Sequence, residues 1–453
     1  MSTGTFRVAT LVGLAMTAPA AGGAGEPAFV AETVYQAPSA IYGLAWGEFD
    51  PASAGSEAAC LLADGSVVEL TRHSGGWTAA QIHKGLGPIG GMIDRPTICI
   101  GDVHSGYPGN EIVIDGGKHL IVLRRGAGWS YEILFTVGAA GAGWGSRVGD
   151  IDPDHPGEEI LHSLEGVMDR GTIGVFRESS GIWTEEIIYA EHVVMDSAVG
   201  EFDPLHPGAE LVAVTEMGPA YEIYPPTGNP TGYWPRRTLW DDMENAGWVA
   251  RIADVEPELF GNEIVYGTRY SDRITMSYAT GSTGHQLEIL FTGNAPPGYM
   301  TMYDIAIADV LPAAAGREIL GVDASGSVYL LRRLARSSWQ GRVIWQNPAG
   351  PLHAVVANDL LPARLGEEIL VAGQSGAVTL LKWASVAADF DDDGDVDLTD
   401  FSHLQACFNG PNRPYAGDGC ADADLDRDTD VDVADFSGFQ GCFNGPNRLP
   451  RCL

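Results

Sequence analysis

The chain has 453 residues, a formal net charge of -34 and 59 glycines, and 45% of its residues are hydrophobic. This composition is typical of a folded, turn-rich β protein rather than of a disordered chain. The excess of carboxylates would repel the phosphates of nucleic acids and of anionic membranes. We therefore expect neither as a partner.

The first twenty residues have the features of an export signal. Arg7 precedes an apolar run from Val8 to Ala18, and Ala18-Pro19-Ala20 offers small residues for cleavage. This pattern predicts a signal peptide over residues 1–20 and a protein that is secreted or held at the cell surface. A disordered tail is the alternative. No later segment reaches about 18 apolar residues, so we expect no membrane span.

A Gly-x-Glu motif followed by an apolar strand recurs seven times, at a spacing of about 50 residues. The motifs are Gly55/Glu57, Gly109/Glu111, Gly157/Glu159, Gly208/Glu210, Gly261/Glu263, Gly316/Glu318 and Gly366/Glu368. Eight residues before each glycine stands a Gly, Ala or Asn that is followed directly by an acid. These acids are Glu48, Asp102, Asp150, Glu201, Asp254, Asp309 and Asp359. Because one four-stranded propeller blade has about this length, we expect seven blades.

Each repeat continues with a glycine-containing turn, an alternating strand and, in most repeats, a final strand that begins with an aromatic residue. Such turns between strands of period two predict hairpins. The seventh repeat ends at Trp383 without a final strand, whereas residues 29–35 align with the final strand at 129–135. We therefore predict an all-β, seven-bladed β-propeller over residues 29–384. Residues 29–35 should complete its last blade, and the closing aromatics should pack between blades.

The third repeat carries Gly149-Asp150-Ile151-Asp152-Pro153-Asp154, followed by Pro156-Gly157-Glu158-Glu159-Ile160. In these segments the chain resembles the FG-GAP and integrin-α-like propeller repeats of secreted and surface proteins. The resemblance implies a weak Ca²⁺ site formed by Asp150, Asp152 and Asp154. The alternative, which we expect in the other blades, is that the loop acids accept hydrogen bonds from backbone N–H groups in turns.

One column of residues lies five positions before the Gly, Ala or Asn of each repeat, at the start of the predicted innermost strands. Its members are Tyr42, Pro96, Trp144, Met195, Trp248, Tyr303 and His353. Asp196 and Asp304 come one place later, and Arg147 and Arg251 come three places later. Aromatic rings beside charged hydrogen-bonding groups are typical of concave sites for sugars or extended ligands. Two interpretations stay open: the column binds a ligand at one mouth of the channel, or it packs between blades.

Residues 389–400 have the spacing of a calcium-binding loop. Acids stand at loop positions 1, 3, 5, 9 and 12, Gly394 stands at position 6, and position 7 offers its backbone carbonyl. EF-hand loops bind Ca²⁺ through hard oxygen ligands in this order, so we expect Ca²⁺ as the cation. The predicted ligands are Asp389, Asp391, Asp393, Asp395, Asp397 and Asp400.

A second loop begins 35 residues later, with predicted ligands Asp424, Asp426, Asp428, Asp430, Asp432 and Asp435. Its position 6 is Thr429, a β-branched residue that resists positive φ, so this loop should bind Ca²⁺ more weakly or in a distorted form. We expect short helices after the loops, at 401–407 and 436–442. The alternative is a solvated, disordered acidic tail.

The paired loops and helices resemble a dockerin type I module. The resemblance implies a small α-helical, calcium-binding domain over residues 389–453 and a cohesin-like partner. The CFNGPN segments and the extra cysteines depart from the cellulosomal pattern.

Four of the six cysteines lie in the last fifty residues. Cys407 and Cys442 occupy matching CFNGPNR segments, and each is followed by another cysteine 10 to 13 residues later. We predict the disulfides Cys407–Cys420 and Cys442–Cys452, which require an oxidising compartment. Cys60 and Cys99 fall on neighbouring predicted strands, where they are either two buried free thiols or a third disulfide.

The sequence contains no HExxH, Walker, dinucleotide-binding or GxSxG nucleophile-elbow motif. Three functions stay open. The first is a secreted, non-catalytic binding or scaffold protein, whose propeller face binds a polysaccharide or a protein partner while the tail attaches through Ca²⁺. The second is an extracellular polysaccharide-degrading glycosidase or lyase that carries a dockerin. The third is a structural protein of the cell envelope.

Overall fold

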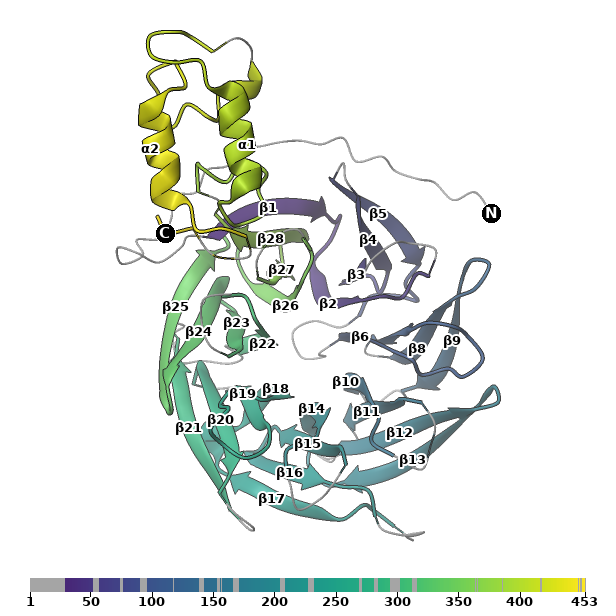
Figure 1. Cartoon of the computed structure of the whole chain (residues 1–453). Helices are drawn as coiled ribbons and strands as arrows, with labels where there is room; N and C mark the ends of the chain where they lie inside the picture. Colours follow the sequence, from purple (N-terminus) through teal and green to yellow (C-terminus); the bar gives the residue numbers. More distant parts are fainter. Residues whose placement is uncertain are drawn as a thin grey trace.

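A computed structural model of the chain shows a ring of β-sheets with a pair of helices beside it (Figure 1). It describes residues 29–453, except for 52–56, 74–75, 90–95, 117, 138–141, 153–154, 156, 166–170, 204–207, 227–231, 269–270, 281–283, 294–301, 312–315, 363, 365, 385, 416–417, 447, 449 and 453. The predicted signal peptide over residues 1–20 therefore lies outside the described residues.

Seven antiparallel four-stranded sheets are arranged in a ring, and each runs outwards from an innermost strand (Figure 1). The innermost strands are β2 (Ile41–Gly47), β6 (Thr97–Gly101), β10 (Ala142–Gly149), β14 (Val194–Gly200), β18 (Gly247–Ala253), β22 (Met302–Ala308) and β26 (Leu352–Asn358). The second strands are β3 (Glu57–Leu62), β7 (Glu111–Asp115), β11 (Glu159–Glu165), β15 (Glu210–Thr215), β19 (Glu263–Thr268), β23 (Glu318–Asp323) and β27 (Glu368–Gly373). The third strands are β4 (Val67–His73), β8 (His119–Arg125), β12 (Gly171–Ser179), β16 (Pro219–Ile223), β20 (Arg273–Ala279), β24 (Ser327–Ala335) and β28 (Ala377–Trp383). The outer strands are β5 (Gly76–His83), β9 (Trp129–Thr136), β13 (Ile182–Ala190), β17 (Arg236–Asp241), β21 (His285–Thr292), β25 (Ser338–Gln346) and β1 (Phe29–Gln36).

The chain is a seven-bladed β-propeller, as the repeats predict. We number the blades 1 to 7 from β2 to β26. Blade 7 takes its outer strand from the beginning of the described chain, because β1 pairs antiparallel with β28. Phe29 lies opposite Trp383, and their rings stack with centroids 4.7 Å apart. This pairing covers the edge that β28 would otherwise expose.

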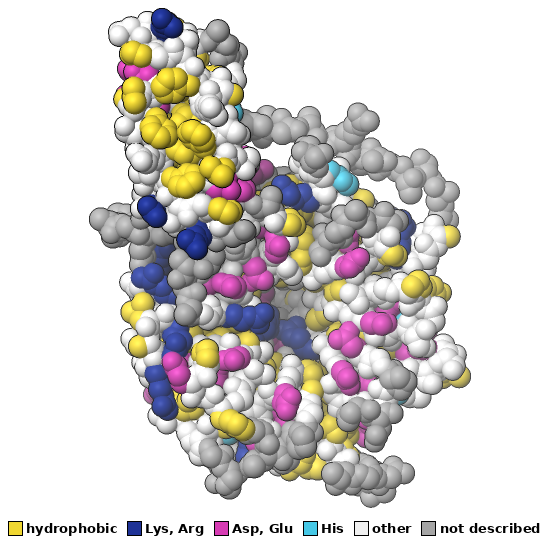
Figure 2. All heavy atoms as spheres, in the orientation of Figure 1, with side chains coloured by type: hydrophobic (Ala, Val, Ile, Leu, Met, Phe, Trp, Pro, Cys, Tyr) yellow, Lys and Arg dark blue, Asp and Glu magenta, His cyan; other side chains and the backbone are white. Residues whose placement is uncertain are grey.

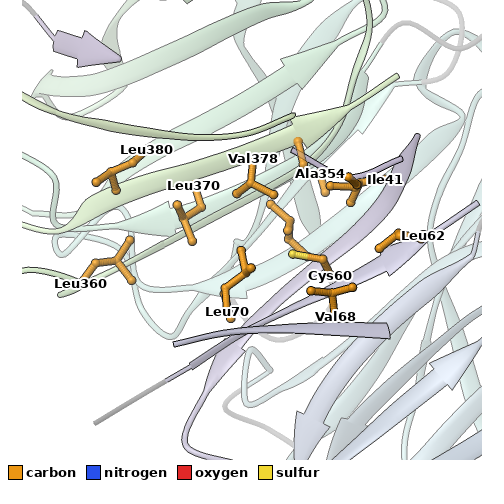
Figure 3. Close-up of a cluster of buried hydrophobic side chains, with 14 of the residues drawn as sticks. Ile41, Cys60, Leu62, Val68, Leu70, Ala354, Leu360, Leu370, Val378 and Leu380 are labelled. Carbon is orange, nitrogen blue, oxygen red and sulfur yellow. The ribbon is translucent and has the colours of Figure 1, made fainter. Parts of the chain in front are cut away.

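Apolar clusters fill the space between neighbouring blades. Figure 3 shows the cluster between blades 7 and 1, where Cys60 and Leu70 of blade 1 meet Leu370 and Val378 of blade 7. The closing aromatics belong to such clusters, as predicted: Trp77 packs against this one. Burying apolar side chains contributes about 25 cal/mol per Å², so these interfaces stabilise the ring.

The repeated glutamate holds the loop that leaves the innermost strand. In every blade its Oε2 accepts hydrogen bonds of 2.9–3.4 Å from backbone N–H groups seven or eight residues earlier. These glutamates are almost completely buried. Burial raises the pKa of five of them to about 7: Glu111, Glu210, Glu263, Glu318 and Glu368. The motif is therefore a structural clamp rather than a site.

The middle residue of Gly-x-Glu connects a blade to the one before it. The Asn110 side chain donates to the carbonyl of Glu48 at 2.9 Å, and Asn262 donates to Glu201 at 2.7 Å. Where the middle residue is a glutamate, its carboxylate accepts instead: Glu158 accepts from the N–H of Asp102 at 2.7 Å. The repeat thus encodes the contact between neighbouring blades as well as the blade itself.

Two helices and two disulfides form the tail after blade 7. The helices are α1 (Leu398–Cys407) and α2 (Val433–Cys442), and a short 3₁₀ helix, η2 (Asp418–Cys420), lies between them. The other short 3₁₀ helix, η1 (Met243–Asn245), belongs to the propeller and precedes β18. Both helices begin three residues earlier than predicted. Asp397 and Asp432 act as N-caps, and each forms a capping box with the aspartate three residues later. No helix among the described residues is long and apolar enough to span a membrane.

Both predicted disulfides are confirmed. Cys407 bonds to Cys420 and Cys442 bonds to Cys452, and each bond ties the end of a helix to the segment that follows it. Cys60 is buried and Cys99 is partly buried, and neither forms a disulfide. The free-thiol alternative is therefore the correct one for this pair.

Candidate functional site

Six of the seven innermost strands carry a β-bulge at the column identified in the sequence. The register with the second strand skips one residue in each of these blades. The skipped residues are Tyr42, Trp144, Met195, Trp248, Tyr303 and His353. In blade 2 the corresponding residue, Pro96, comes just before β6. Bulges redirect side chains and are common beside functional sites, so the column is a built feature of the ring.

Five members of the column line a hollow of about 650 Å³, open volume included, at one mouth of the channel. They are Tyr42, Pro96, Trp248, Tyr303 and His353. Arg147, Arg251 and Asp304 also line it, as do the apolar groups of Leu44 and Ile98. Figure 2 shows Lys and Arg side chains beside the depression near the middle of this face.

Three rings on neighbouring blades meet in the hollow. Tyr42 stacks on His353 with centroids 5.0 Å apart and an interplanar angle of 16°, and Tyr303 meets His353 edge-on at 5.3 Å. His353 Nδ1 lies 3.0 Å from the carbonyl oxygen of Ile41, so this nitrogen carries the proton and donates. Burial lowers the pKa of His353, which leaves the ring neutral with Nε2 as an acceptor.

Arginines and aspartates alternate around the same mouth, one to a blade. Arg147 lies 2.7 Å from Asp196, and Arg251 lies 3.4 Å from Asp196 and 2.6 Å from Asp304. Both aspartates also accept backbone hydrogen bonds from the next innermost strand, Asp196 from Ala250 at 3.0 Å and Asp304 from Val355 at 3.1 Å. This ladder joins blades 3 to 7 and contains two positive and two negative charges.

Two members of the column do not reach the hollow. Trp144 and Met195 form a buried cluster with Val193 and Trp248, and the rings of Trp144 and Trp248 are T-shaped at 6.3 Å. Trp144 Nε1 donates to Glu165 at 2.7 Å. This burial favours the packing alternative for these two residues. Nothing in the sequence distinguished these two residues from the members that line the hollow, because all of them lie at the same offset in the repeat.

The blade loops contain arginine partners that the sequence did not reveal. In blade 3, Asp152 is 3.0 Å from Arg177 Nε, and in blade 4, Asp203 is 2.7 Å from Arg237. Between blades, Arg125 reaches Asp50 at 3.1 Å. A guanidinium thus neutralises the second loop acid in each case. Asp150 is exposed, and Asp154 lies outside the described residues, so the blade 3 calcium site stays a prediction.

Five of the six predicted acids of the first tail loop fall into two groups that share Asp400, and Asp393 belongs to neither group. Carboxylate oxygens of Asp389, Asp391 and Asp400 lie within 4.8 Å of one another, and so do those of Asp395, Asp397 and Asp400. Asp389 accepts from the N–H groups of Asp393 and Gly394 at 3.1 and 3.0 Å, which folds the loop back on its first ligand. Burial and the nearby Asp400 raise the pKa of Asp389 to about 7.

The second loop has the same hydrogen bonds as the first. Asp424 accepts from Asp428 and Thr429 at 3.1 and 2.9 Å, and Asp435 closes the loop at Leu425. Thr429 adopts φ 82°, close to the 93° of Gly394. Thr429 therefore adopts the backbone conformation that glycine has in the first loop, and Arg427 is a second non-glycine residue of this loop at positive φ. Asp430 Oδ1 is buried and accepts no hydrogen bond, which is compatible with its predicted role as a ligand.

The CFNGPN segments link the two loops crosswise. The N–H groups of Asn409 and Gly410, after α1, donate to the carbonyl of Val431 in the second loop at 2.9 and 3.0 Å. Asn444 and Gly445, after α2, donate in the same way to Val396 in the first loop, both at 3.1 Å. Each CFNGPN segment thus holds the loop that belongs to the other half of the tail. In the sequence, only the repetition of the segment pointed to this role.

One arginine of blade 7 connects the propeller to the first tail loop. The buried side chain of Arg364 donates to the carbonyls of Asp392 and Trp383 at 2.7 and 2.9 Å, and it also pairs with the Asp392 carboxylate. Lys382 reaches the same carboxylate at 3.1 Å. Asp392 occupies loop position 4, which is not a predicted ligand position.

The comparisons with known proteins agree on the fold alone. No protein-family model matches the sequence, and no curated protein matches it. Two crystal structures of BBS1N in complex with ARL6DN, soaked with lead and with mercury, are similar to this chain with TM-scores of 0.52 and 0.51. Each is 13% identical and covers 78% of this chain and 96% of its own. A structure of YCF48 bound to D1 peptide has a TM-score of 0.47 at 14% identity, over 80% of this chain and 97% of its own.

Proposed function

We propose that this protein is a non-catalytic binding protein, in which the channel mouth of the propeller holds the ligand and the tail attaches through Ca²⁺. The observation that carries the proposal is the set of bulges that directs Tyr42, Tyr303 and His353 into one hollow. A bulge interrupts the strand ladder, so six of them at one level favour a role beyond packing. The similar propeller BBS1N forms a complex with ARL6DN, which supports binding as a use of this fold.

A hydrolytic role has less support. Glycosidases use two carboxyl groups on opposite sides of the scissile bond. Among the described residues that line the hollow, Asp304 is the only carboxylate, and it is held by Arg251 and by two backbone N–H groups. An aspartate so occupied is poorly suited to act as an acid or a nucleophile.

The tail is proposed as a dockerin-like Ca²⁺ module. In each loop, Asp residues at positions 1, 3, 5, 9 and 12, with the position-7 carbonyl, would hold the ion. The ion would supply charge that orders the loop, since the tail carries a net charge of -11 from fifteen Asp and four Arg. The attachment partner would be cohesin-like or another surface protein.

Secretion or display at the cell surface fits the disulfides, the proposed Ca²⁺ loops and the repeats of the chain. The disulfides Cys407–Cys420 and Cys442–Cys452 form in oxidising compartments. Extracellular fluids also supply Ca²⁺ at concentrations that modest sites can use. The FG-GAP-like repeats point the same way, because that family occurs in secreted and surface proteins.

The test is a binding array of glycans and of secreted proteins, probed with the full chain in Ca²⁺ and in chelator. We expect binding through the hollow to be lost in Tyr303→Ala and kept in Tyr233→Ala, a control that removes a 55% exposed tyrosine elsewhere. Binding through the tail should vanish in chelator. Binding that survives Tyr303→Ala would exclude the channel mouth as the ligand site.

A further inference from the structure

We infer that the hollow at the channel mouth takes a single uncharged sugar ring, which packs on the cluster of Tyr42, His353 and Tyr303 and hydrogen-bonds to the arginine–aspartate ladder. This inference rests on the proposed function, because it names the ligand class of that same site. The ring belongs either to a free sugar or to the end of a glycan.

The charges around the hollow balance. Arg147 and Arg251 contribute two positive charges, and Asp196 and Asp304 contribute two negative charges at 2.6–3.4 Å from them. An anionic ligand would have to displace an aspartate from its arginine, and a cationic ligand would approach two guanidinium groups. Both are costly in a half-buried site, where charges are poorly screened. An uncharged ligand meets neither penalty.

The hydrogen-bonding groups are of both kinds. Arg147 and Arg251 can only donate, the Asp304 carboxylate and the neutral His353 Nε2 can only accept, and the Tyr42 hydroxyl can do either. A carboxylate or phosphate ligand would need donors alone. Sugar hydroxyls donate and accept at once, so a polyhydroxylated ring uses the whole set.

The rings form a corner rather than a flat wall. Tyr42 and His353 lie nearly parallel at 16°, whereas Tyr303 stands at 79° to His353. The negative face of an aromatic ring attracts the weakly positive C–H groups on one face of a pyranose. A corner holds the face and the edge of one compact ring, whereas a long flat chain would need an open groove.

The inference is tested by calorimetric titration of the full chain in Ca²⁺ with glucose, galactose, mannose, glucuronate, glucosamine and oligomers of the neutral sugars. We expect at least one neutral sugar to bind more than tenfold tighter than both charged ones. A gain with the oligomers would identify a glycan end, and equal affinity would identify the free sugar. Tyr42→Ala should reduce affinity at least tenfold, Tyr42→Phe should cause a smaller loss because it keeps the ring, and Tyr233→Ala should change nothing.

Melting temperatures establish that each variant is folded before its affinity is compared. Tighter binding of glucuronate or glucosamine would overturn the inference and leave the proposed function standing, and so would binding of a protein alone that is lost in Tyr42→Ala. Failure of every neutral sugar to bind would also overturn the inference. Binding of any class that no variant of the hollow weakens would contradict both.

Discussion

At the residue scale, the repeated glutamate decides whether a blade loop keeps its shape. Glu263 accepts from the N–H groups of Val255 and Glu256 at 2.9 and 3.0 Å, while its Oε1 is buried without a hydrogen-bond partner. Glu263→Ala leaves two buried N–H groups unpaired, so we expect the free energy of unfolding to fall by about 2–5 kcal/mol. Urea denaturation in excess Ca²⁺ measures this loss.

The same residue gives a pH dependence with a definite sign. Burial raises the pKa of Glu263 to about 7 from an ordinary value of 4.5. Between these values the folded state keeps the proton and the unfolded state has lost it, so stability falls as pH rises from about 4.5 to 7 and then levels. Glu263→Gln keeps the acceptor and removes the titration. It should match the wild type at pH 5 and exceed it at pH 8. Equal effects at both pH values would refute the assignment.

The two tail loops differ at position 6, where the first has Gly394 and the second has Thr429. A residue other than glycine costs about 1–2 kcal/mol at positive φ, which corresponds to roughly 5- to 30-fold in affinity if the loop is ordered only when Ca²⁺ is bound. We expect Thr429→Gly to tighten the second site by this factor, measured by calorimetric titration. The matched change Gly394→Thr should weaken the first site. No effect of either change on affinity would mean that strain at position 6 does not limit binding.

The sequence located most of the candidate site but not its internal contacts. The column and its flanking charges were visible because a fixed offset recurs in seven repeats. The sequence did not reveal that Asp196 and Asp304 bridge successive blades. A hydrogen bond between two blades does not change the spacing of residues along the chain, so the repeat pattern cannot predict it. The clamp by Glu263 and its equivalents was equally hidden, although the motif itself was the first signal of the fold.

At the element scale, β1 is the part of blade 7 that closes the ring. It pairs with β28 over seven residue pairs and brings Phe29 onto Trp383. Deletion of residues 1–36 should lower the melting temperature by more than about 10 °C, because it exposes β28 and one apolar interface. Deletion of residues 1–28 is the control and should change little. Equal melting temperatures of the two truncated chains would contradict closure by β1.

The contact between blade 7 and the tail can be tested separately. Arg364→Ala removes two backbone hydrogen bonds and an ion pair to Asp392 and Trp383. We expect hydrogen exchange in residues 389–400 to become faster while Ca²⁺ still binds, because Asp392 is not among the predicted ligands. Arg236→Ala on blade 4, which removes an exposed ion pair to Glu191, is the control. Unchanged exchange in Arg364→Ala would show that the arginine does not hold the loop.

Strands were easier to predict than helix ends. Periodicity and turns marked each blade, and alignment of 29–35 with 129–135 pointed to the partner of β28. The helices began earlier than predicted because Asp397 and Asp432 serve as caps as well as loop acids. The loop pattern assigned these aspartates to the loops alone, so their second role as helix N-caps was missed.

At the scale of the whole molecule, the ring and the tail are stabilised in different ways. The ring is held by apolar interfaces and by hydrogen bonds and ion pairs between blades. The tail has one small apolar cluster, around Val396, Leu404 and Phe439, and two disulfides. Its net charge of -11 opposes folding through repulsion between the carboxylates. Its order should therefore depend on Ca²⁺, whereas the order of the ring should not.

Calorimetric melting of the full chain in Ca²⁺ and in chelator tests this division most directly. We expect two transitions in Ca²⁺, of which the tail transition disappears in chelator while the temperature of the ring transition changes little. Two transitions whose temperatures are the same in Ca²⁺ and in chelator, or a ring transition that disappears in chelator, would contradict this division.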